Sequence, residues 1–140
     1  MRSYFVSDIH LSNENKALSD AFINFLNEIK GSCSQLFILG DLFEIWIGDD
    51  DDSEYINIIK SELLKFTNNG PDTFFMHGNR DFLIGEQFSK ETGIKILSDP
   101  HQIKINTKKV LLSHGDALCI DDVDYINFRN QVRDKSWQAN

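Results

Sequence analysis

Five polar residues stand where short apolar runs end, and their types are those that bind metal ions. Asp8 and His10 follow the first run, Asp41 the second, Asn79 the third and His114 the fourth. Residues that only cap helices would be mainly Ser, Thr and Asp, whereas oxygen and nitrogen ligands mixed in this way suit transition-metal ions. We therefore expect these side chains to bind metal.

The spacing of the ligand candidates indicates how they would be brought together. Positions 8, 41, 79 and 114 lie 33, 38 and 35 residues apart, and a strand with its following helix takes roughly 30 residues or more. In open α/β sheets, ligands collect beyond the carboxyl ends of the strands. We expect four neighbouring strands that all end at one rim, with positions 8 and 10 pointing to the same side of an extended chain.

Hydrophobic periodicity predicts the elements that would hold these strands. Apolar residues recur at helical spacing over residues 18–29 and 55–66, and a shorter helix is expected over 85–92, closed by a glycine. Residues 94–96 and 103–105 alternate apolar with polar side chains, which predicts half-exposed, antiparallel strands.

Two features beside the candidate ligands allow more than one interpretation. Trp46 and Ile47 could belong to the core or to an apolar wall beside a site, and we favour the core. The acidic residues 49–52 predict a solvated loop whose charges favour the amino end of the next helix. We prefer that interpretation to a further metal site.

The charge of the chain limits its partners. With 22 acidic and 14 basic residues, the net charge of -8 argues against an extended surface for nucleic acid. It does not exclude a small anionic substrate. Arg80 offers a planar fork suited to phosphate, and the alternative is an ion pair with Asp81 or Asp116.

Length and cysteine content favour one domain in a reducing compartment. A chain of 140 residues with 41% hydrophobic content suffices for one core. Cys33 and Cys119 are too few for a disulfide framework, which favours the cytoplasm. No stretch approaches the ~20 apolar residues that span a bilayer, so any membrane contact would be peripheral.

The motifs together resemble a known family. In order, they are Asp8-x-His10, Gly40-Asp41-Leu42-Phe43-Glu44, His77-Gly78-Asn79-Arg80-Asp81 and His114-Gly115-Asp116. This order is similar to the motif order of the calcineurin-like metallophosphoesterases. The residues within the motifs resemble those of one branch of that family, the UDP-2,3-diacylglucosamine pyrophosphatases of lipid A biosynthesis. The resemblance covers residues from about 4 to 137. It implies an α/β sandwich of that family, here incomplete, with a mixed sheet flanked by helices.

The resemblance also implies which residues bind metal. Asp8 and His10 would hold one manganese ion, Asn79 and His114 a second, and Asp41 would bridge the two ions. Two metal ions in such a site activate a water molecule and stabilise an in-line displacement at phosphorus.

For the substrate, the resemblance implies contacts at two places. Asn79 and Arg80 would contact its phosphate, and Asp122 its glucosamine unit. The reaction would be hydrolysis of the pyrophosphate bond of UDP-2,3-diacylglucosamine to UMP and 2,3-diacylglucosamine 1-phosphate. The resemblance further implies a cytoplasmic protein peripheral to the inner membrane, and leaves the oligomeric state open.

One departure from the family bears on activity. The closing Gly-His-x-His motif does not occur in the sequence, whose four histidines are at 10, 77, 101 and 114. The helical lid of the family would also lie beyond residue 140. We expect residues 1–140 to be the amino-terminal portion of the domain and, alone, to be impaired. The alternatives are another metallophosphoesterase acting on a nucleotide or phosphoprotein, and an inactive metal-binding fragment.

Overall fold

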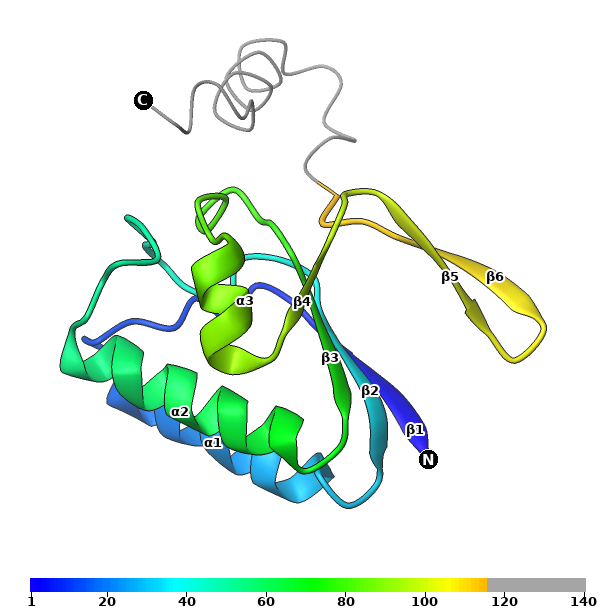
Figure 1. The fold of residues 1–140 in the computed structure, drawn as a ribbon, viewed down its shortest axis with the longest axis horizontal. Helices are drawn as coiled ribbons and strands as arrows, with labels where there is room; N and C mark the ends of the chain where they lie inside the picture. The colour runs from blue at the N-terminus through cyan, green and yellow to red at the C-terminus, as the bar shows by residue number, and fades with distance from the viewer. Residues whose placement is uncertain (116–140) are drawn as a thin grey trace, which may run out of the picture.

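The computed structural model describes residues 1–115. Strands and helices alternate at first, and a hairpin follows (Figure 1). In chain order the elements are β1 (Arg2–Val6), α1 (Lys16–Ile29), β2 (Cys33–Ile38), α2 (Glu54–Asn68), β3 (Asp72–Met76), α3 (Glu86–Thr92), β4 (Lys95–Leu97), β5 (His101–Ile105) and β6 (Lys108–Leu112).

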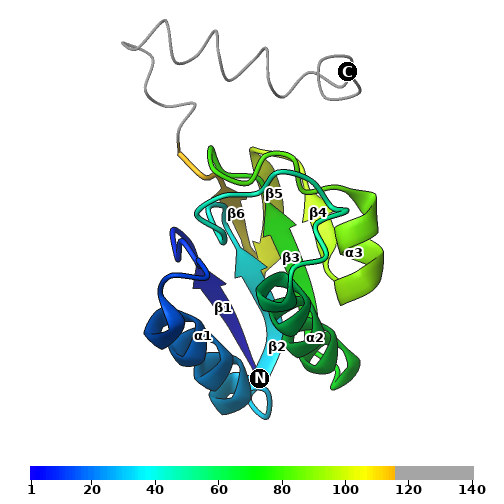
Figure 2. The same ribbon diagram turned by 90° about the vertical axis from the view of Figure 1, so that its left-hand side faces the viewer.

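The first four strands form a parallel sheet in the order β1-β2-β3-β4. Figure 2 shows α1, α2 and α3 on one face of this sheet and the β5-β6 hairpin on the other. The sheet lies between these two layers, so β2 and β3 read as the near-continuous apolar runs that parallel strands show when both faces are covered. The α/β class predicted from the sequence is confirmed.

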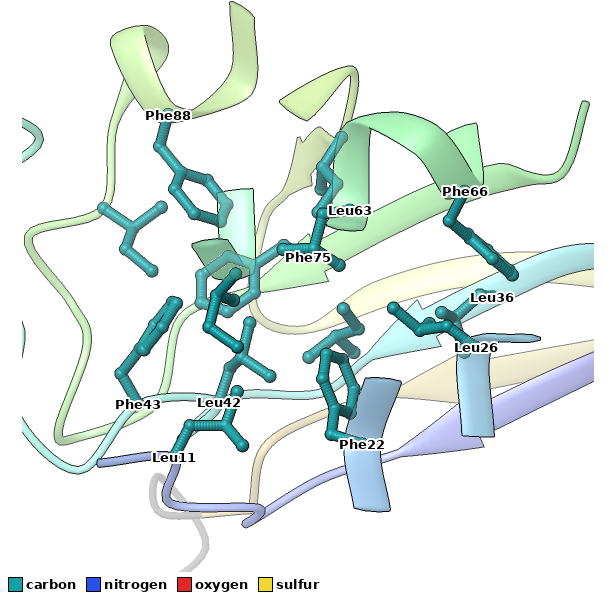
Figure 3. Packing of buried hydrophobic residues seen from close by; sticks show 14 of the residues in the cluster. Leu11, Phe22, Leu26, Leu36, Leu42, Phe43, Leu63, Phe66, Phe75 and Phe88 are labelled. Carbon is teal, nitrogen blue, oxygen red and sulfur yellow. The ribbon is translucent and has the colours of Figure 1, made fainter. Parts of the chain in front are cut away.

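The main core lies between the helices and the sheet (Figure 3). Phe22 and Leu26 from α1, Leu63 and Phe66 from α2, and Phe88 from α3 meet side chains of the sheet. Several of these side chains are fully buried. Burial of one such side chain stabilises the fold by roughly 1.5–3 kcal/mol. This core therefore holds the strands in fixed positions up to their carboxyl ends.

A second, smaller cluster lies between the sheet and the hairpin. Phe37 from β2, Met76 from β3 and Leu112 from β6 are its buried members. The rings of Phe5, Phe37 and Phe74 stack across β1, β2 and β3 on this side, with centroids 5.1 and 4.8 Å apart. The hairpin is thus attached to the sheet face that carries no helix.

The structure corrects the expected strand arrangement at two places. Residues 95–97 pair in parallel with β3, where an antiparallel strand was expected. Antiparallel pairing is confined, within residues 1–115, to β5 and β6. The strand before His114 therefore belongs to the hairpin and not to the parallel sheet. The alternating pattern correctly indicated half-exposed strands but cannot distinguish their direction.

Local capping explains where the helices begin and end. Asn15 caps α1, because its side-chain oxygen accepts from the Leu18 N–H at 3.1 Å, so the helix begins two residues before the expected range. Gly93, with φ of 75°, closes α3 as predicted. No helix among residues 1–115 is long and apolar enough to cross a membrane.

The loop after β2 differs in part from expectation. Trp46 is buried at 5% exposure, which confirms the core interpretation, but Ile47 is 74% exposed and that interpretation is wrong for it. Asp49 is not simply solvated. Its carboxylate accepts from the N–H groups of Gly85 and Phe88 and from Trp46 Nε1, so it caps α3 rather than the next helix.

Candidate metal centre

The chains leaving β1 and β2 remain paired beyond the sheet. The N–H groups of Asp8 and His10 donate to the carbonyls of Gly40 and Asp41, each at 3.0 Å. Asp8, His10 and Asp41 all adopt positive φ, between 53° and 55°. Such left-handed conformations cost roughly 1–3 kcal/mol for a residue other than glycine and gather at functional sites. The fold therefore holds three predicted ligands in strained backbone positions.

The two oxygens of the Asp41 carboxylate have different surroundings. Oδ1 accepts the backbone N–H of Arg80 at 2.8 Å. Oδ2 faces two imidazoles, lying 3.8 Å from His10 Nε2 and 3.5 Å from His114 Nε2. Asp8 approaches from the side of His10, with 3.8 Å between its Oδ1 and the same Nε2. Asp41 Oδ2 is therefore the atom around which the candidate ligands gather.

Asn79 completes the group on the side of His114. Its side-chain oxygen lies 3.2 Å from His114 Nε2. The same position of the amide is 2.7 Å from Asp41 Oδ2, so without a cation the amide is best turned to donate its N–H to that carboxylate. With the oxygen inward, acceptor atoms of all three residues converge. Such a cluster of acceptors fits a bound cation.

The second ring nitrogen of each histidine has its own partner. His114 Nδ1 lies 2.8 Å from the carbonyl oxygen of Leu39, which can only accept. The proton of a neutral His114 is therefore on Nδ1, and Nε2 is left to bind metal. His10 Nδ1 lies 2.9 Å from a carboxylate oxygen of Glu44. Metal-bound histidines commonly donate their other N–H to such groups.

Two glycines allow the segments to approach this closely. A Cβ atom on Gly78 would collide with the carboxylate and backbone nitrogen of Asp41. A Cβ atom on Gly40, whose φ is 92°, would lie 2.5 Å from His114 Nδ1 and 2.8 Å from the Gly78 backbone. Only glycine permits this contact between the ends of β2, β3 and the hairpin.

Asp81 is a buried carboxylate that binds the backbone of both loops. Its side chain accepts from the N–H groups of Asp41, Leu42, Phe43 and Gly78, at 2.7 to 3.3 Å. The residue is 0% exposed, and burial raises its pKa although the N–H groups of Gly78, Phe43 and Asp41 oppose the shift. Asp81 thus joins the turn that carries Asp41 to the turn that precedes Asn79.

Electrostatics link Asp41 and His114 as an ion pair. Burial disfavours the charged form of Asp41, but the hydrogen bond with His114 and the Arg80 N–H outweigh it and lower the pKa of this carboxyl. The same hydrogen bond raises the pKa of His114 to about 9. At neutral pH the metal-free centre therefore has a proton on both nitrogens of His114, and a cation must displace one of them.

The remaining predicted contacts are placed in part. Arg80 lies at the edge of the centre, and its Nη1 is 3.5 Å from Glu44 Oε1. The alternative pairing of Arg80 with Asp81 is wrong, because that carboxylate is turned to the backbone amides. Asp116 and Asp122 lie outside the described residues.

The observed donors fit divalent ions. Three residues, Asp8, His10 and Asp41, each offer one ligand atom, and these three atoms lie within 4.8 Å of one another. Asn79 and His114 adjoin the same Asp41 oxygen from the other side. Carboxylate, imidazole and amide groups are ordinary ligands of such ions. All five predicted ligands therefore come together, although His114 arrives from the hairpin.

Sequence reasoning did not assign a role to Glu44, and it considered the carboxylate of Asp81 only as an ion-pair partner of Arg80. A carboxylate that accepts from backbone amides has no characteristic spacing, because the amides belong to every residue type. Glu44 lay inside a recognised motif, and its position three residues after Asp41 was the only signal available.

Comparison with known proteins agrees with this geometry. The calcineurin-like phosphoesterase family matches residues 1–140. A UDP-2,3-diacylglucosamine hydrolase of Haemophilus influenzae (strain PittGG) is 50% identical over 133 residues, which cover 95% of this chain and 56% of that protein. The protein of the same name from Stenotrophomonas maltophilia (strain R551-3) is 44% identical over 139 residues, which cover 99% and 56%.

The chain spans about half the length of these curated relatives. Among solved structures, the nuclease MPE of Pseudomonas putida is similar with a TM-score of 0.55 and 19% identity, over 71% of this chain and 49% of that one. That likeness shows a shared fold. The match of the family over residues 1–140 establishes that the chain belongs to the calcineurin-like phosphoesterase family.

Proposed function

We propose that this chain forms the metal-binding part of a hydrolase that cleaves the pyrophosphate bond of UDP-2,3-diacylglucosamine. The products are UMP and 2,3-diacylglucosamine 1-phosphate, an intermediate of lipid A biosynthesis. The observation that carries the proposal is the gathering of metal-binding side chains around Asp41 Oδ2. The choice of substrate rests on the names of relatives that are up to 50% identical.

In this proposal the residues hold two manganese ions. Asp8 and His10 hold one ion, Asn79 and His114 the other, and Asp41 belongs to both. The position of Asp41 Oδ2 between the two imidazole Nε2 atoms supports the bridging role. To hold an ion, the Asn79 amide would present its oxygen at the position from which its NH₂ group donates to Asp41 in the absence of metal.

Two divalent ions bound in such a site supply Lewis acidity and lower the pKa of water. The Arg80 guanidinium contacts the substrate phosphate and offsets charge that develops on its oxygens. Asn79 contacts the same phosphate, and Asp122 contacts the glucosamine unit. The leaving group is itself a phosphate, so no strong general acid is required from the chain.

The proposed substrate sets the cellular context. It carries two acyl chains, so we place the protein in the cytoplasm, peripheral to the inner membrane. The acidic composition argues against an extended nucleic-acid surface and does not exclude a small anionic substrate.

We further propose that residues 1–140 alone are impaired in turnover. The sequence holds no Gly-His-x-His, the motif that in this family gives one histidine to each ion. The 140-residue chain is then expected to bind manganese in calorimetry with little hydrolysis.

Product analysis tests the proposed reaction. The complete product of the gene is incubated with Mn²⁺ and UDP-2,3-diacylglucosamine, and the products are identified by mass spectrometry. UMP and the 1-phosphate are expected, and chelation of the metal should stop their release. UDP-N-acetylglucosamine, which has the same pyrophosphate but no long acyl chains, is the matched control. Absence of UMP, or equal release from the control, would overturn the assignment.

A further inference from the structure

Glu44 occupies a place that none of the proposed ligand or substrate roles explains. It follows β2, and its backbone N–H donates to the Leu11 carbonyl at 2.9 Å. Leu11 and Phe43 form an isolated parallel bridge just before this contact. The paired backbone therefore fixes the relative positions of residue 44 and of His10, which directly precedes Leu11.

The two oxygens of the Glu44 carboxylate face different partners. Oε2 lies 2.9 Å from His10 Nδ1, and Oε1 lies 3.5 Å from Arg80 Nη1. The side chain is 39% exposed, so water reaches it while it touches both groups. Arg80 is paired with the oxygen that the imidazole does not contact, and it helps to keep the carboxylate in place.

The two ring nitrogens of His10 face different carboxylates. Its Nδ1 is buried and has no hydrogen bond of good geometry among the described residues. The carboxylate of Glu44 is nevertheless at hydrogen-bonding distance. Both side chains are only partly buried, so a small rotation of either one aligns the hydrogen bond. The opposite nitrogen, Nε2, faces Asp8 and Asp41.

We propose that Glu44 is a positioning residue that keeps the His10 proton on Nδ1 and thereby presents Nε2 to a metal ion. The inference rests on the proposed metal centre and adds a residue that acts through His10. A carboxylate behind a metal-bound histidine fixes both the ring orientation and the tautomer, and its loss costs 10–100-fold in metal affinity. For His114 the Leu39 carbonyl does the same task through the backbone.

The consequence is a difference between the two histidines. A backbone carbonyl cannot be removed by substitution, whereas the partner of His10 can. Replacing Glu44 should therefore disturb the tautomer of His10 and leave that of His114 unchanged. A merely structural role of Glu44 would move neither tautomer selectively.

The test uses the 140-residue chain with Glu44→Ala and Glu44→Gln. Imidazole ¹⁵N spectra of the metal-free protein, recorded with both imidazoles neutral, report where each proton lies. His10 should be protonated at Nδ1 in the unsubstituted chain and a mixture in Glu44→Ala. Glu44→Gln keeps an oxygen acceptor and should restore Nδ1 protonation. Glu14 is an exposed carboxylate that lines one surface pocket together with Leu11 and Glu44, so Glu14→Gln is the matched control.

Manganese affinity gives the second measurement. Titration followed by electron paramagnetic resonance should show 10–100-fold weaker binding for Glu44→Ala and an unchanged affinity for Glu14→Gln. An unaltered His10 tautomer in Glu44→Ala would overturn the proposal. Equal losses of manganese affinity in Glu44→Ala and Glu14→Gln would also overturn it. Neither measurement uses the substrate, so failure of UDP-2,3-diacylglucosamine hydrolysis would leave these results unaffected.

Discussion

Asp41 Oδ2 lies 3.5 Å from His114 Nε2, so the end of a parallel strand and the end of a hairpin meet through one ion pair. Without metal this pair is held by a proton, because the hydrogen bond raises the pKa of His114 to about 9. With metal the same two atoms are proposed ligands. The contact therefore stabilises the fold of the metal-free protein, and its two atoms are available as ligands when metal is bound.

The raised pKa of His114 predicts how stability depends on pH. The pair stabilises the metal-free fold fully below pH 6.5, the ordinary value for histidine, and the contribution is lost as pH rises through about 9. We expect the free energy of unfolding to fall by roughly 1–3 kcal/mol across that window. Urea unfolding in EDTA at several pH values measures it. His114→Gln cannot titrate, so an equal fall in that variant would contradict the prediction.

Replacement of the proposed bridging residue should abolish metal binding. Asp41→Ala removes the oxygen shared by both imidazoles, and we expect no measurable Mn²⁺ binding in calorimetry. Asp52→Ala, in the exposed loop, is the control and should bind normally. Circular dichroism of both variants verifies that they fold. An unchanged stoichiometry in Asp41→Ala would rule out the bridging role.

A single methyl group at Gly78 should separate the two ligand-bearing turns. Gly78→Ala places a Cβ against the backbone of Asp41, so we expect a loss of roughly 1–3 kcal/mol in the free energy of unfolding and weaker Mn²⁺ binding. Gly31→Ala has open space within 4 Å and should change stability by less than about 0.5 kcal/mol. Similar melting curves for the two variants would show that the turns are not closely packed.

The buried carboxylate of Asp81 should be costly to neutralise. Asp81→Asn keeps one oxygen acceptor but turns an NH₂ group toward backbone N–H donors. We expect a loss of roughly 2–4 kcal/mol in chemical denaturation. Asp72→Asn is a matched change at an exposed ion pair with Lys95, where at most about 1 kcal/mol is at stake. Equal effects of the two changes would refute the structural role of Asp81.

The sequence was sufficient to predict which side chains gather around Asp41 and most of the sheet. Apolar runs ending in Asp8, Asp41 and Asn79 predict parallel strands that end at a common rim. The apolar side chains mark the buried strands and the polar side chains mark the ligands, so both can be identified in the sequence. Those three strands lie side by side, as expected. The helices followed from their periodicity in the same way.

The placement of His114 could not be predicted in this way. Its strand shows the same apolar run as the others, yet β6 pairs with β5 outside the parallel sheet. The direction of β4 was likewise open, since alternation reports exposure and not partner orientation. The role of Asp81 depends on backbone amides of two distant turns. These features arise from tertiary packing that no local pattern encodes.

The contact between Leu39 and His114 closes a span of 75 residues. Gly40 beside it leaves no room for a side chain between the turn and the imidazole. Residue 114 leaves the ribosome long after β1, β2 and β3, which already lie side by side in the sheet. During synthesis from the amino terminus, the candidate metal centre can therefore be completed only after the hairpin has been made.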